Sequence, residues 1–387
     1  MRVCLVSDNL IGYHDTWSGA EMIVQYLENL LRKNGHQVSL LTVKSKKPLP
    51  EDNIFPVPLN LFSRFTSAFS QLRKIKPEAV HFFHTNSLFL PVMLACKVLG
   101  IPATFTVLDY WILCPTGHCL QSGGEICRER EGKVCFKCVP PYKFLQRLLV
   151  RRLAKDLKYL VTFTETSKKR LVERGFPPEK IRVKYIYEFS FQTPEEKKTL
   201  RDHDILFVGT FRKQKGLDVV ITALKEVVLK IPDARLAVIG RGGQKDKERI
   251  DSLVEKLGLA ESIEFLGQKG NEEVLKIVSQ ANLVVVAEQW FSDFGPVALV
   301  EAMAQGAPVV SGDLGSPPDF IKHGFNGYLA KYNDPKSFAQ NIIYLLENKE
   351  KAEEVGKNAR FAIQDIFRGN REEEIINLYA NNRLGKN

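Results

Sequence analysis

Short runs of apolar residues alternate with helix-like segments along almost the whole of this 387-residue chain. The first run, at residues 3–7, is continuous rather than alternating, which is typical of a parallel strand buried on both faces. A segment from about Ala20 to Lys33 follows with the apolar spacing of an amphipathic helix. Because parallel strands need a long crossover connection, this repeated pairing of strand and helix predicts a doubly wound α/β architecture.

The alternation occurs in two series, separated by a stretch that shows neither pattern. The first series predicts further strands at 37–43, 79–83, 103–107, 160–164 and 181–186, and the second predicts strands at 205–208, 235–239, 263–266, 283–286, 308–311 and 327–330. Proline and charged residues between the series predict a linker over 191–203. We therefore expect an N-terminal domain over 1–190, a C-terminal domain over 204–369, and a helix in 370–387 that crosses back to the first domain.

The chain carries a net charge of +10, which favours anionic partners such as nucleotide phosphates, nucleic acid or acidic lipid headgroups. Residues 1–7 form too short an apolar run for a signal peptide. The most apolar long stretch, 87–105, is interrupted by Lys97, Gly100 and Pro102, which argues against a helix that spans a bilayer. We therefore expect a cytoplasmic protein without a transmembrane anchor.

The loop after the first strand differs from a dinucleotide-binding loop. It reads DNLIGYHDTWSGAE, with Gly12 and Gly19, in place of G-x-G-x-x-G. This difference argues against a nicotinamide or flavin oxidoreductase. A long loop that ends at a helix N-terminus lets a substrate approach backbone N–H groups, and a mobile surface loop is the alternative.

The sharpest candidate anion site opens the second series. The sequence ILFVGTFRKQKGL places Gly209, Arg212 and Lys215 between a predicted strand and a helix that begins at Gly216. Arg offers a planar fork and Lys a movable point charge, so the pair can clamp a diphosphate. A second glycine turn, which contains Gly240, follows the next strand and is predicted at the same sheet edge. Two solvated basic side chains are the alternative interpretation.

Two acidic residues in EQWFSDFGPVALVEAMAQGAPVV are candidates for binding hydroxyl groups. Asp293 precedes a predicted helix, and Glu301 lies one to two turns into it. Carboxylates placed in this way suit the hydroxyls of a sugar and of a ribose. A solvated helix start with an N-cap is the alternative.

Together these segments resemble the retaining glycosyltransferases of family four, the glycosyl transferases group 1, which transfer a sugar from a nucleotide diphosphate sugar. The resemblance covers nearly the whole chain and is carried by S-G-A-E at 18–21, G-T-F-R-K-Q-K-G at 209–216 and E-A-M-A-Q-G-A-P-V-V at 301–310. It implies the GT-B fold, in which two Rossmann-like doubly wound α/β domains face a cleft.

The resemblance also implies roles for individual residues. Arg212 and Lys215 would hold the diphosphate, Glu301 would accept the ribose hydroxyls, and Asp293 would touch the transferred sugar. The implied donor-binding residues are Glu301, Gly209, Gly240, Phe294 and Gly295. The candidate acceptor-side residues are Gly19, Glu21, Asp109 and His84.

This sequence departs from the family pattern at two positions. Asp293 stands where the family has Glu, so Glu288, Ser292 or the backbone at 294–295 are candidates to share the sugar contacts. Leu108 stands beside Asp109 where the family often has His, which leaves His81, His84 and His118 as substitutes; a structural hydrogen-bonding role is the alternative for His81 and His84. In the family, transfer without an enzymic nucleophile is ascribed to front-face attack assisted by the leaving phosphate, so only stabilisation of that phosphate is indispensable.

Five of the seven cysteines lie within one short segment, an insertion at about 111–140. In a reducing compartment this crowding favours metal binding. Cys135 and Cys138 form one half of a tetrahedral thiolate site. Cys114 with Cys127 are candidates for the other half, with Cys119 or His118 in reserve. We expect a structural zinc, with an iron–sulfur cluster, disulfides or free thiols as alternatives, and we expect that catalysis requires no cofactor.

The segment 142–158 has the pattern of a basic amphipathic helix. The expected apolar side consists of Leu145, Leu148, Leu149, Leu153 and Leu157, and the basic neighbours are Lys143, Arg147, Arg151, Arg152, Lys155 and Lys158. Such a helix suits docking to an anionic membrane surface. Packing of the leucines on the core is the alternative.

The leading hypothesis is therefore a retaining glycosyltransferase at the cytoplasmic face of a membrane, in polysaccharide biosynthesis. Its partners would be a nucleotide diphosphate sugar and a glycan or lipid-linked acceptor, without nucleic acid. A hydrolase or epimerase of nucleotide sugars on the same fold is one alternative. A zinc-containing nucleic-acid-binding or scaffold protein is the other.

Overall fold

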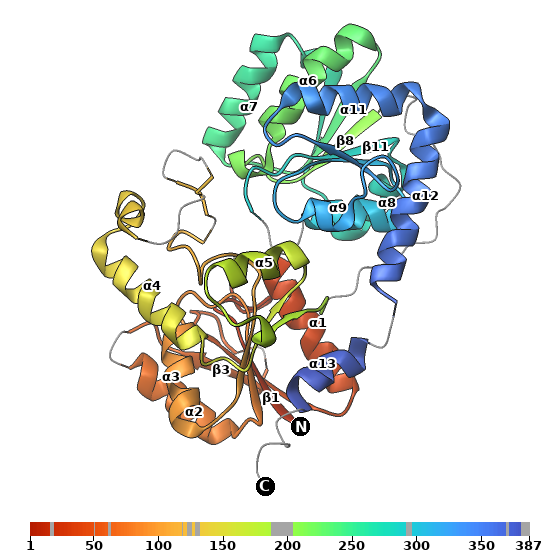
Figure 1. Cartoon of the computed structure of the whole chain (residues 1–387). Helices are drawn as coiled ribbons and strands as arrows, with labels where there is room; N and C mark the ends of the chain where they lie inside the picture. Colours follow the sequence, from red (N-terminus) through yellow and green to blue (C-terminus); the bar gives the residue numbers. More distant parts are fainter. Residues whose placement is uncertain are drawn as a thin grey trace. The chain divides into compact units, whose positions relative to one another are not determined.

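The computed structural model describes residues 1–15, 19–49, 51–60, 63–117, 119–121, 126–127, 132–186, 204–291, 296–368 and 371–380. Contacts between Cα atoms divide the chain into unit 1, residues 1–188 with 369–387, and unit 2, residues 189–368. Figure 1 shows helices on both sides of the sheet in each unit. The predicted linker, 191–203, lies outside the described residues.

Unit 1 is built on a parallel sheet in the order β3-β2-β1-β4-β5-β6-β7. The strands are β1 (Arg2–Val6), β2 (Gln37–Val43), β3 (Ile54–Val57), β4 (Ala79–Phe82), β5 (Ala103–Thr106), β6 (Tyr159–Thr162) and β7 (Ile181–Val183). The helices are α1 (Gly19–Lys33), α2 (Arg64–Ile75), α3 (Phe89–Leu99), α4 (Pro141–Ala154), α5 (Glu165–Glu173) and α13 (Arg371–Ala380), with short 3₁₀ turns η1 (Lys133–Lys137) and η2 (Pro178–Lys180). The order of the strands reverses between β1 and β4, so the carboxyl ends of these two strands mark the switch point where doubly wound sheets bind ligands.

The C-terminal helix α13 belongs to unit 1, although it is remote from it in sequence. The hydroxyl group of Tyr379 in α13 lies 2.6 Å from Nδ1 of His81 in β4, and both side chains are buried. The other ring nitrogen of His81 lies 2.7 Å from Oγ1 of Thr106 in β5. These contacts tie the end of the described chain to the centre of the first sheet.

Unit 2 repeats the same topology, with a parallel sheet in the order β10-β9-β8-β11-β12-β13. The strands are β8 (Asp204–Val208), β9 (Arg235–Ile239), β10 (Ile263–Gly267), β11 (Leu283–Val286), β12 (Val309–Gly312) and β13 (Tyr328–Ala330). The helices are α6 (Leu217–Lys230), α7 (Gln244–Leu257), α8 (Asn271–Gln280), α9 (Val297–Gln305), α10 (Pro317–Phe320), α11 (Pro335–Glu347) and α12 (Lys349–Ile366), with 3₁₀ turns η3 (Lys213–Lys215) and η4 (Ala260–Ser262). Its switch point lies between β8 and β11.

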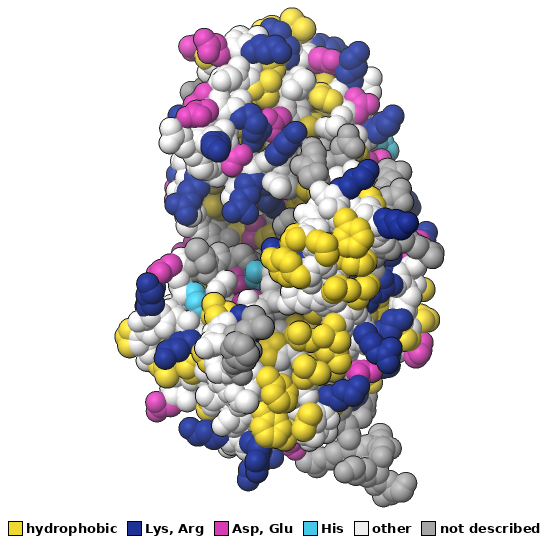
Figure 2. Space-filling view, turned by 90° about the vertical axis from the view of Figure 1, so that its left-hand side faces the viewer, with side chains coloured by type: hydrophobic (Ala, Val, Ile, Leu, Met, Phe, Trp, Pro, Cys, Tyr) yellow, Lys and Arg dark blue, Asp and Glu magenta, His cyan; other side chains and the backbone are white. Residues whose placement is uncertain are grey.

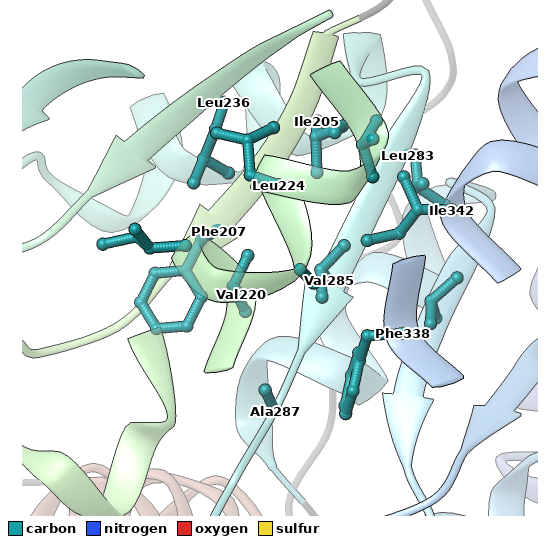
Figure 3. Packing of buried hydrophobic residues seen from close by; sticks show 14 of the residues in the cluster. Ile205, Phe207, Val220, Leu224, Leu236, Leu283, Val285, Ala287, Phe338 and Ile342 are labelled. Atoms are coloured by element: carbon teal, nitrogen blue, oxygen red, sulfur yellow. The ribbon is translucent and has the colours of Figure 1, made fainter. Parts of the chain in front are cut away.

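In the core of unit 2, the apolar faces of the strands pack against the apolar faces of α6 and α11. Alternate residues of the strands point to one face of the sheet, and residues four apart on α6 and α11 pack against them (Figure 3). The residues concerned are Ile205 and Phe207 of β8, Leu283 and Val285 of β11, Val220 and Leu224 of α6, and Phe338 and Ile342 of α11. All are buried, and burying each such large side chain contributes about 1.5–3 kcal/mol.

The predicted fold class, two Rossmann-like doubly wound α/β domains, is confirmed. The sequence pattern missed β3, which pairs only with β2 at the edge of the first sheet. Over the part of the chain that the structure describes, no helix is both long and apolar enough to cross a membrane.

Candidate functional site

The backbone at the switch point of unit 2 is packed so closely that glycine is required. A Cβ atom on Gly216 would lie 1.8 Å from the carbonyl oxygen of Ala287, which follows β11, and the φ angle of Gly216 is +74°. A Cβ atom on Gly240, where φ is +145°, would lie 1.9 Å from the carbonyl oxygen of Gly209. The glycines therefore bring the ends of β8, β9 and β11 into direct contact.

This packing places a cationic loop at the end of β8. Lys215 Nζ donates a hydrogen bond to Oε1 of Glu288, which follows β11 and is 8% exposed. The other oxygen of that carboxylate, Oε2, is buried and has no hydrogen-bond partner among the described residues. Arg212 is exposed at the start of η3, and the described residues offer it no ion pair. Among the described residues, the loop thus presents Arg212 without an ion pair and Lys215 held in place by a buried carboxylate.

Glu301 contributes a carboxylate from α9. Burial raises the pKa of Glu301 to about 7, from an ordinary value of 4.5. No hydrogen bond from another described residue compensates for this burial. Hydroxyl donors supplied by a ligand would stabilise the ionised form of this buried carboxylate.

A second set of polar groups lies at the switch point of unit 1. Asp8 follows β1 and accepts hydrogen bonds from the backbone nitrogens of Ser87, at 2.7 Å, and Leu88, at 3.1 Å. His84 follows β4, and its Nδ1 lies 3.4 Å from Oε1 of Glu21, which is 2% exposed in the first turn of α1. The imidazole of His84 and the carboxylates of Asp8 and Glu21 thus lie at the switch point between β1 and β4.

The electrostatics of this set favour a charged imidazole. The hydrogen bond to Glu21 is the main cause that raises the pKa of His84; partial burial opposes it, and the carboxylates of Asp109 and Asp8 add to it. Burial raises the pKa of Asp8, although the two backbone hydrogen bonds and His84 counteract this effect. By contrast, burial lowers the pKa of His81 to about 3, so this residue is a neutral structural group.

The predicted residues that the structure describes divide between the two units. Gly209, Arg212, Lys215 and Gly240 lie at the carboxyl edge of the second sheet, and Glu301 lies in α9 of the same unit. Gly19 begins α1, and Glu21, His84 and Asp109 form the electrostatic group of unit 1. Asp293, Phe294 and Gly295, together with the candidates Ser292 and His118, lie outside the described residues.

Sequence reasoning missed Asp8 as a member of the site. The available signal was an acidic residue directly after the first buried strand, a position that faces the switch point in doubly wound sheets. Glu288 was expected to share sugar contacts, and its ion pair with Lys215 was not predicted.

The cysteine segment contains free thiols in the structure. Hydrogen bonds from Cys119 and Thr116 lower the pKa of Cys114 to about 5, against the effect of burial. The backbone nitrogen of Cys127 donates to the carbonyl oxygen of Cys119 at 2.7 Å. In the described ranges, no three His, Cys, Asp or Glu side chains are grouped so as to hold a metal ion. The zinc site stays a prediction.

Both units match known protein families. Residues 189–361 match the family model of the glycosyl transferases group 1, and residues 17–185 match that of glycosyltransferase family 4. An uncharacterized glycosyltransferase of Methanocaldococcus jannaschii is 35% identical over 155 residues, which cover 40% of this chain and 41% of that protein. Spore coat protein SA of Bacillus subtilis is 24% identical over 99% of this chain and 100% of its own.

Solved structures share the fold at low sequence identity. The Anabaena protein HepE, solved in complex with UDP, superposes with a TM-score of 0.78 at 16% identity, over 98% of this chain and 100% of its own. Sucrose-phosphate synthase of Thermosynechococcus elongatus superposes with a TM-score of 0.73 at 18% identity, over 98% of both chains. The two family models together match most of the chain, one in each unit, and the chain therefore belongs to the group 1 glycosyltransferases of the GT-B fold.

Proposed function

We propose that this glycosyltransferase moves a sugar, with retention of anomeric configuration, from a nucleotide diphosphate sugar to a glycan or lipid-linked acceptor. The observation that carries the proposal is the cationic loop 212–215, which lies at the switch point of unit 2 on backbone that only glycine can form. The complexes of the Anabaena structure with UDP and with UDP-glucose support a donor of this class. The site of action is the cytoplasmic face of a membrane.

In the proposed reaction the bond between the anomeric carbon and the diphosphate oxygen breaks. The acceptor hydroxyl oxygen bonds to the same face of that carbon, and its proton passes to the departing diphosphate. Negative charge develops on the diphosphate, so Arg212 and Lys215 stabilise the transition state more than the bound donor. Glu301 accepts hydrogen bonds from the ribose, and Asp293 contacts the transferred sugar. The reaction needs no metal ion because Arg212 and Lys215 supply the positive charge.

On the acceptor side, we assign Gly19, Glu21, His84 and Asp109 to binding of the acceptor. Glu21 holds the His84 ring by the 3.4 Å contact, while Nε2 of the ring lies 3.4 Å from the amide nitrogen of the exposed Asn86. A half-exposed ring held in this way can orient a hydroxyl group. We therefore expect His84→Ala to raise the KM for the acceptor and to leave donor binding unchanged.

The test is transfer by the purified chain, after a thermal-shift panel of nucleotide sugars has identified the donor. Turnover should require an acceptor other than water, continue in EDTA, and give a product with the anomeric configuration of the donor. Arg212→Ala and Lys215→Ala should each reduce the rate by about 10²-fold or more. Near-normal turnover in either folded variant would remove the diphosphate clamp, and turnover with water alone would favour a hydrolase.

The family match disfavours the zinc-containing nucleic-acid-binding alternative. A mobility-shift assay with duplex and single-stranded DNA addresses it directly. We expect no shift at physiological salt.

A further inference from the structure

Helix α4 has buried apolar residues in its last turns and exposed apolar residues nearer its start. Its inward face packs through Val150, Leu153 and Ala154, which are all buried. The expectation that Leu145, Leu148 and Leu149 share one side with Leu153 agrees with the helical spacing of α4, but Leu157 lies beyond Ala154, where the helix ends. Leu153 and Leu157 are buried, whereas Leu145 is 64% exposed, Leu148 42% and Leu149 45%. The outward leucines are not needed to pack the helix.

The exposed apolar surface continues beyond these leucines. Tyr142, at the start of α4, is 65% exposed, and Phe136 of η1 is 49% exposed. The ring of Phe136 meets that of Phe144 edge-to-face, with centroids 5.0 Å apart, which fixes η1 against α4. We call the side chains of Phe136, Tyr142, Leu145, Leu148 and Leu149 the α4 face. Figure 2, which views unit 1 from the side where α4 lies, shows hydrophobic side chains gathered there with Lys and Arg side chains near them.

The charge around the α4 face has one sign. The sequence from Lys133 to Lys155 contains no Asp or Glu. Its exposed basic side chains are Lys133, Lys137, Lys143, Arg152 and Lys155, and in the described part of the chain none of them forms an ion pair. Exposed lysines of other helices do pair, as Lys247 does with Asp251 at 3.0 Å. In the part of the chain that the structure describes, the α4 face thus accompanies exposed basic side chains that no acidic side chain pairs.

Two other arginines of α4 are engaged within unit 1. The guanidinium group of Arg147 lies over the ring of Trp111, at 4.6 Å from its centroid. Arg151 Nη2 donates to the carbonyl oxygen of Arg174. These contacts anchor the helix, so the charges available to a partner are those of the exposed residues.

We propose that the α4 face docks on the surface of an anionic lipid bilayer. A helix that carries apolar side chains outward between basic ones lies in the plane of the interface, with the apolar groups at the level of the headgroups and the cations against lipid phosphates. The one-signed charge favours this occupant, since a lipid surface supplies many anions without a matching geometry. Docking goes beyond sugar transfer itself and would bring the enzyme to a lipid-linked acceptor.

The test is co-sedimentation of the full chain with vesicles of phosphatidylcholine alone or with about one third phosphatidylglycerol, a content high enough to give a strongly negative surface. We expect binding to the anionic vesicles at low salt, little binding to neutral vesicles, and release at about 0.5 M salt, where charges are screened within a few Å. Reversal of charge in Lys137→Glu/Lys143→Glu/Arg152→Glu should reduce binding at least about tenfold.

Leu145→Ser/Leu149→Ser should also reduce vesicle binding, because it removes the inserting side chains. The matched control is Lys225→Glu/Leu229→Ser on α6, where both residues are exposed and Leu229 is 74% exposed, and this variant should bind as the unmodified chain does. Absence of binding to anionic vesicles at low salt, or binding that neither α4 variant weakens, would overturn the proposal. So would conversion of a dimer to a monomer by the leucine variant with vesicle binding unchanged, because the face would then bind a second copy.

Transfer to an acceptor in free solution separates this proposal from the proposed function. Both α4 variants should retain it, since the changed side chains lie outside the donor and acceptor sites. A chain that binds anionic vesicles through α4 but transfers no sugar would refute the proposed function alone.

Discussion

Replacing Glu301 by Gln tests the proposed contact with the ribose, and the structure supplies its magnitude. Burial raises the pKa of Glu301 from 4.5 to about 7. One pKa unit corresponds to about 1.4 kcal/mol, so the ionised carboxylate costs the folded protein about 3 kcal/mol. The amide in Glu301→Gln has a similar shape but no charge. The variant removes the cost of the buried charge and replaces one of the two acceptor oxygens with an NH2 donor.

The pH dependence of stability follows from the sign of the shift. Because the pKa is raised on folding, the folded protein holds a proton that the unfolded chain releases between pH 4.5 and about 7. The free energy of unfolding of the unmodified chain therefore falls as the pH rises through this window. Relative to it, Glu301→Gln should gain about 3 kcal/mol in unit 2 between pH 4.5 and pH 8. Hydrogen exchange of amides in β8 and β11 reports unit 2 separately from unit 1.

Binding of the nucleoside diphosphate proposed for the donor, with UDP as the probe, should show the opposite trend. Ribose hydroxyls favour the ionised carboxylate, so the unmodified chain should bind UDP better at pH 8 than at pH 5.5 and release a proton on binding near pH 6. Glu301→Gln should bind about 1–3 kcal/mol more weakly at pH 8, and the difference should shrink at pH 5.5. Calorimetry of both proteins cancels the titration of UDP itself. Glu353→Gln, at an exposed position on α12, is the control.

Unchanged UDP affinity in Glu301→Gln at pH 8 would refute the ribose contact. If the ratio of the UDP affinities of the two proteins does not vary with pH, ionisation of Glu301 does not affect UDP binding. An unfolding free energy with the same pH dependence in both proteins would refute the raised pKa.

Two further predictions concern unit 1. Tyr379→Phe leaves Nδ1 of the buried His81 without its partner at 2.6 Å, so it should cost about 1–3 kcal/mol of unfolding free energy, while Tyr142→Phe, at an exposed position, should cost nothing measurable by urea unfolding. Burial lowers the pKa of His81 to about 3, so the unfolded chain binds a proton at this residue before the folded chain does. The stability that neutral His81 contributes should therefore be lost as the pH falls below 6.5. For the cysteine segment we expect about one zinc per chain in protein purified under reducing conditions, lost in Cys135→Ser and Cys138→Ser, and metal analysis that returns none, with every thiol reactive, would refute the site.

The order of helices and strands could be read from the sequence because parallel strands buried on both faces leave continuous apolar runs. The missed strand, β3, lacks this signal. It contains Pro56 and pairs on one side only, and proline is tolerated at a sheet edge because one row of N–H groups needs no partner there. The sequence pattern therefore missed this strand because an edge strand can contain proline.

Helix α4 shows a second limit of sequence patterns. Apolar spacing predicts that a helix has an apolar side, but it does not say whether protein covers that side. Leu149 and Leu153 are one turn apart, yet the first is 45% exposed and the second 6%. The difference depends on where η1 and the core of unit 1 lie, which no local pattern contains.

The positions of the site residues could be predicted from local sequence, but their contacts with residues far away in the sequence could not. Arg212 and Lys215 were predictable because cations that follow a strand and precede a helix lie at a ligand-binding edge. The ion pair between Lys215 and Glu288 was not, because the two residues are 73 positions apart and meet only through the adjacency of β8 and β11. Asp8 and His84 likewise meet only because β1 pairs with β4.

The two units use one topological position for opposite charges. In unit 2, the cation Lys215 comes from the loop after β8 and its buried carboxylate, Glu288, follows β11. In unit 1 the carboxylate Asp8 follows β1, and the imidazole of His84 follows β4. In each unit a partly exposed basic side chain contacts a buried carboxylate, Glu288 for Lys215 and Glu21 for His84, which limits the motion of the basic side chain. Because Arg212 adds an exposed cation beside Lys215, an anionic leaving group is better matched by the loop of unit 2, whereas the mixed charges at the switch point of unit 1 suit a neutral hydroxyl.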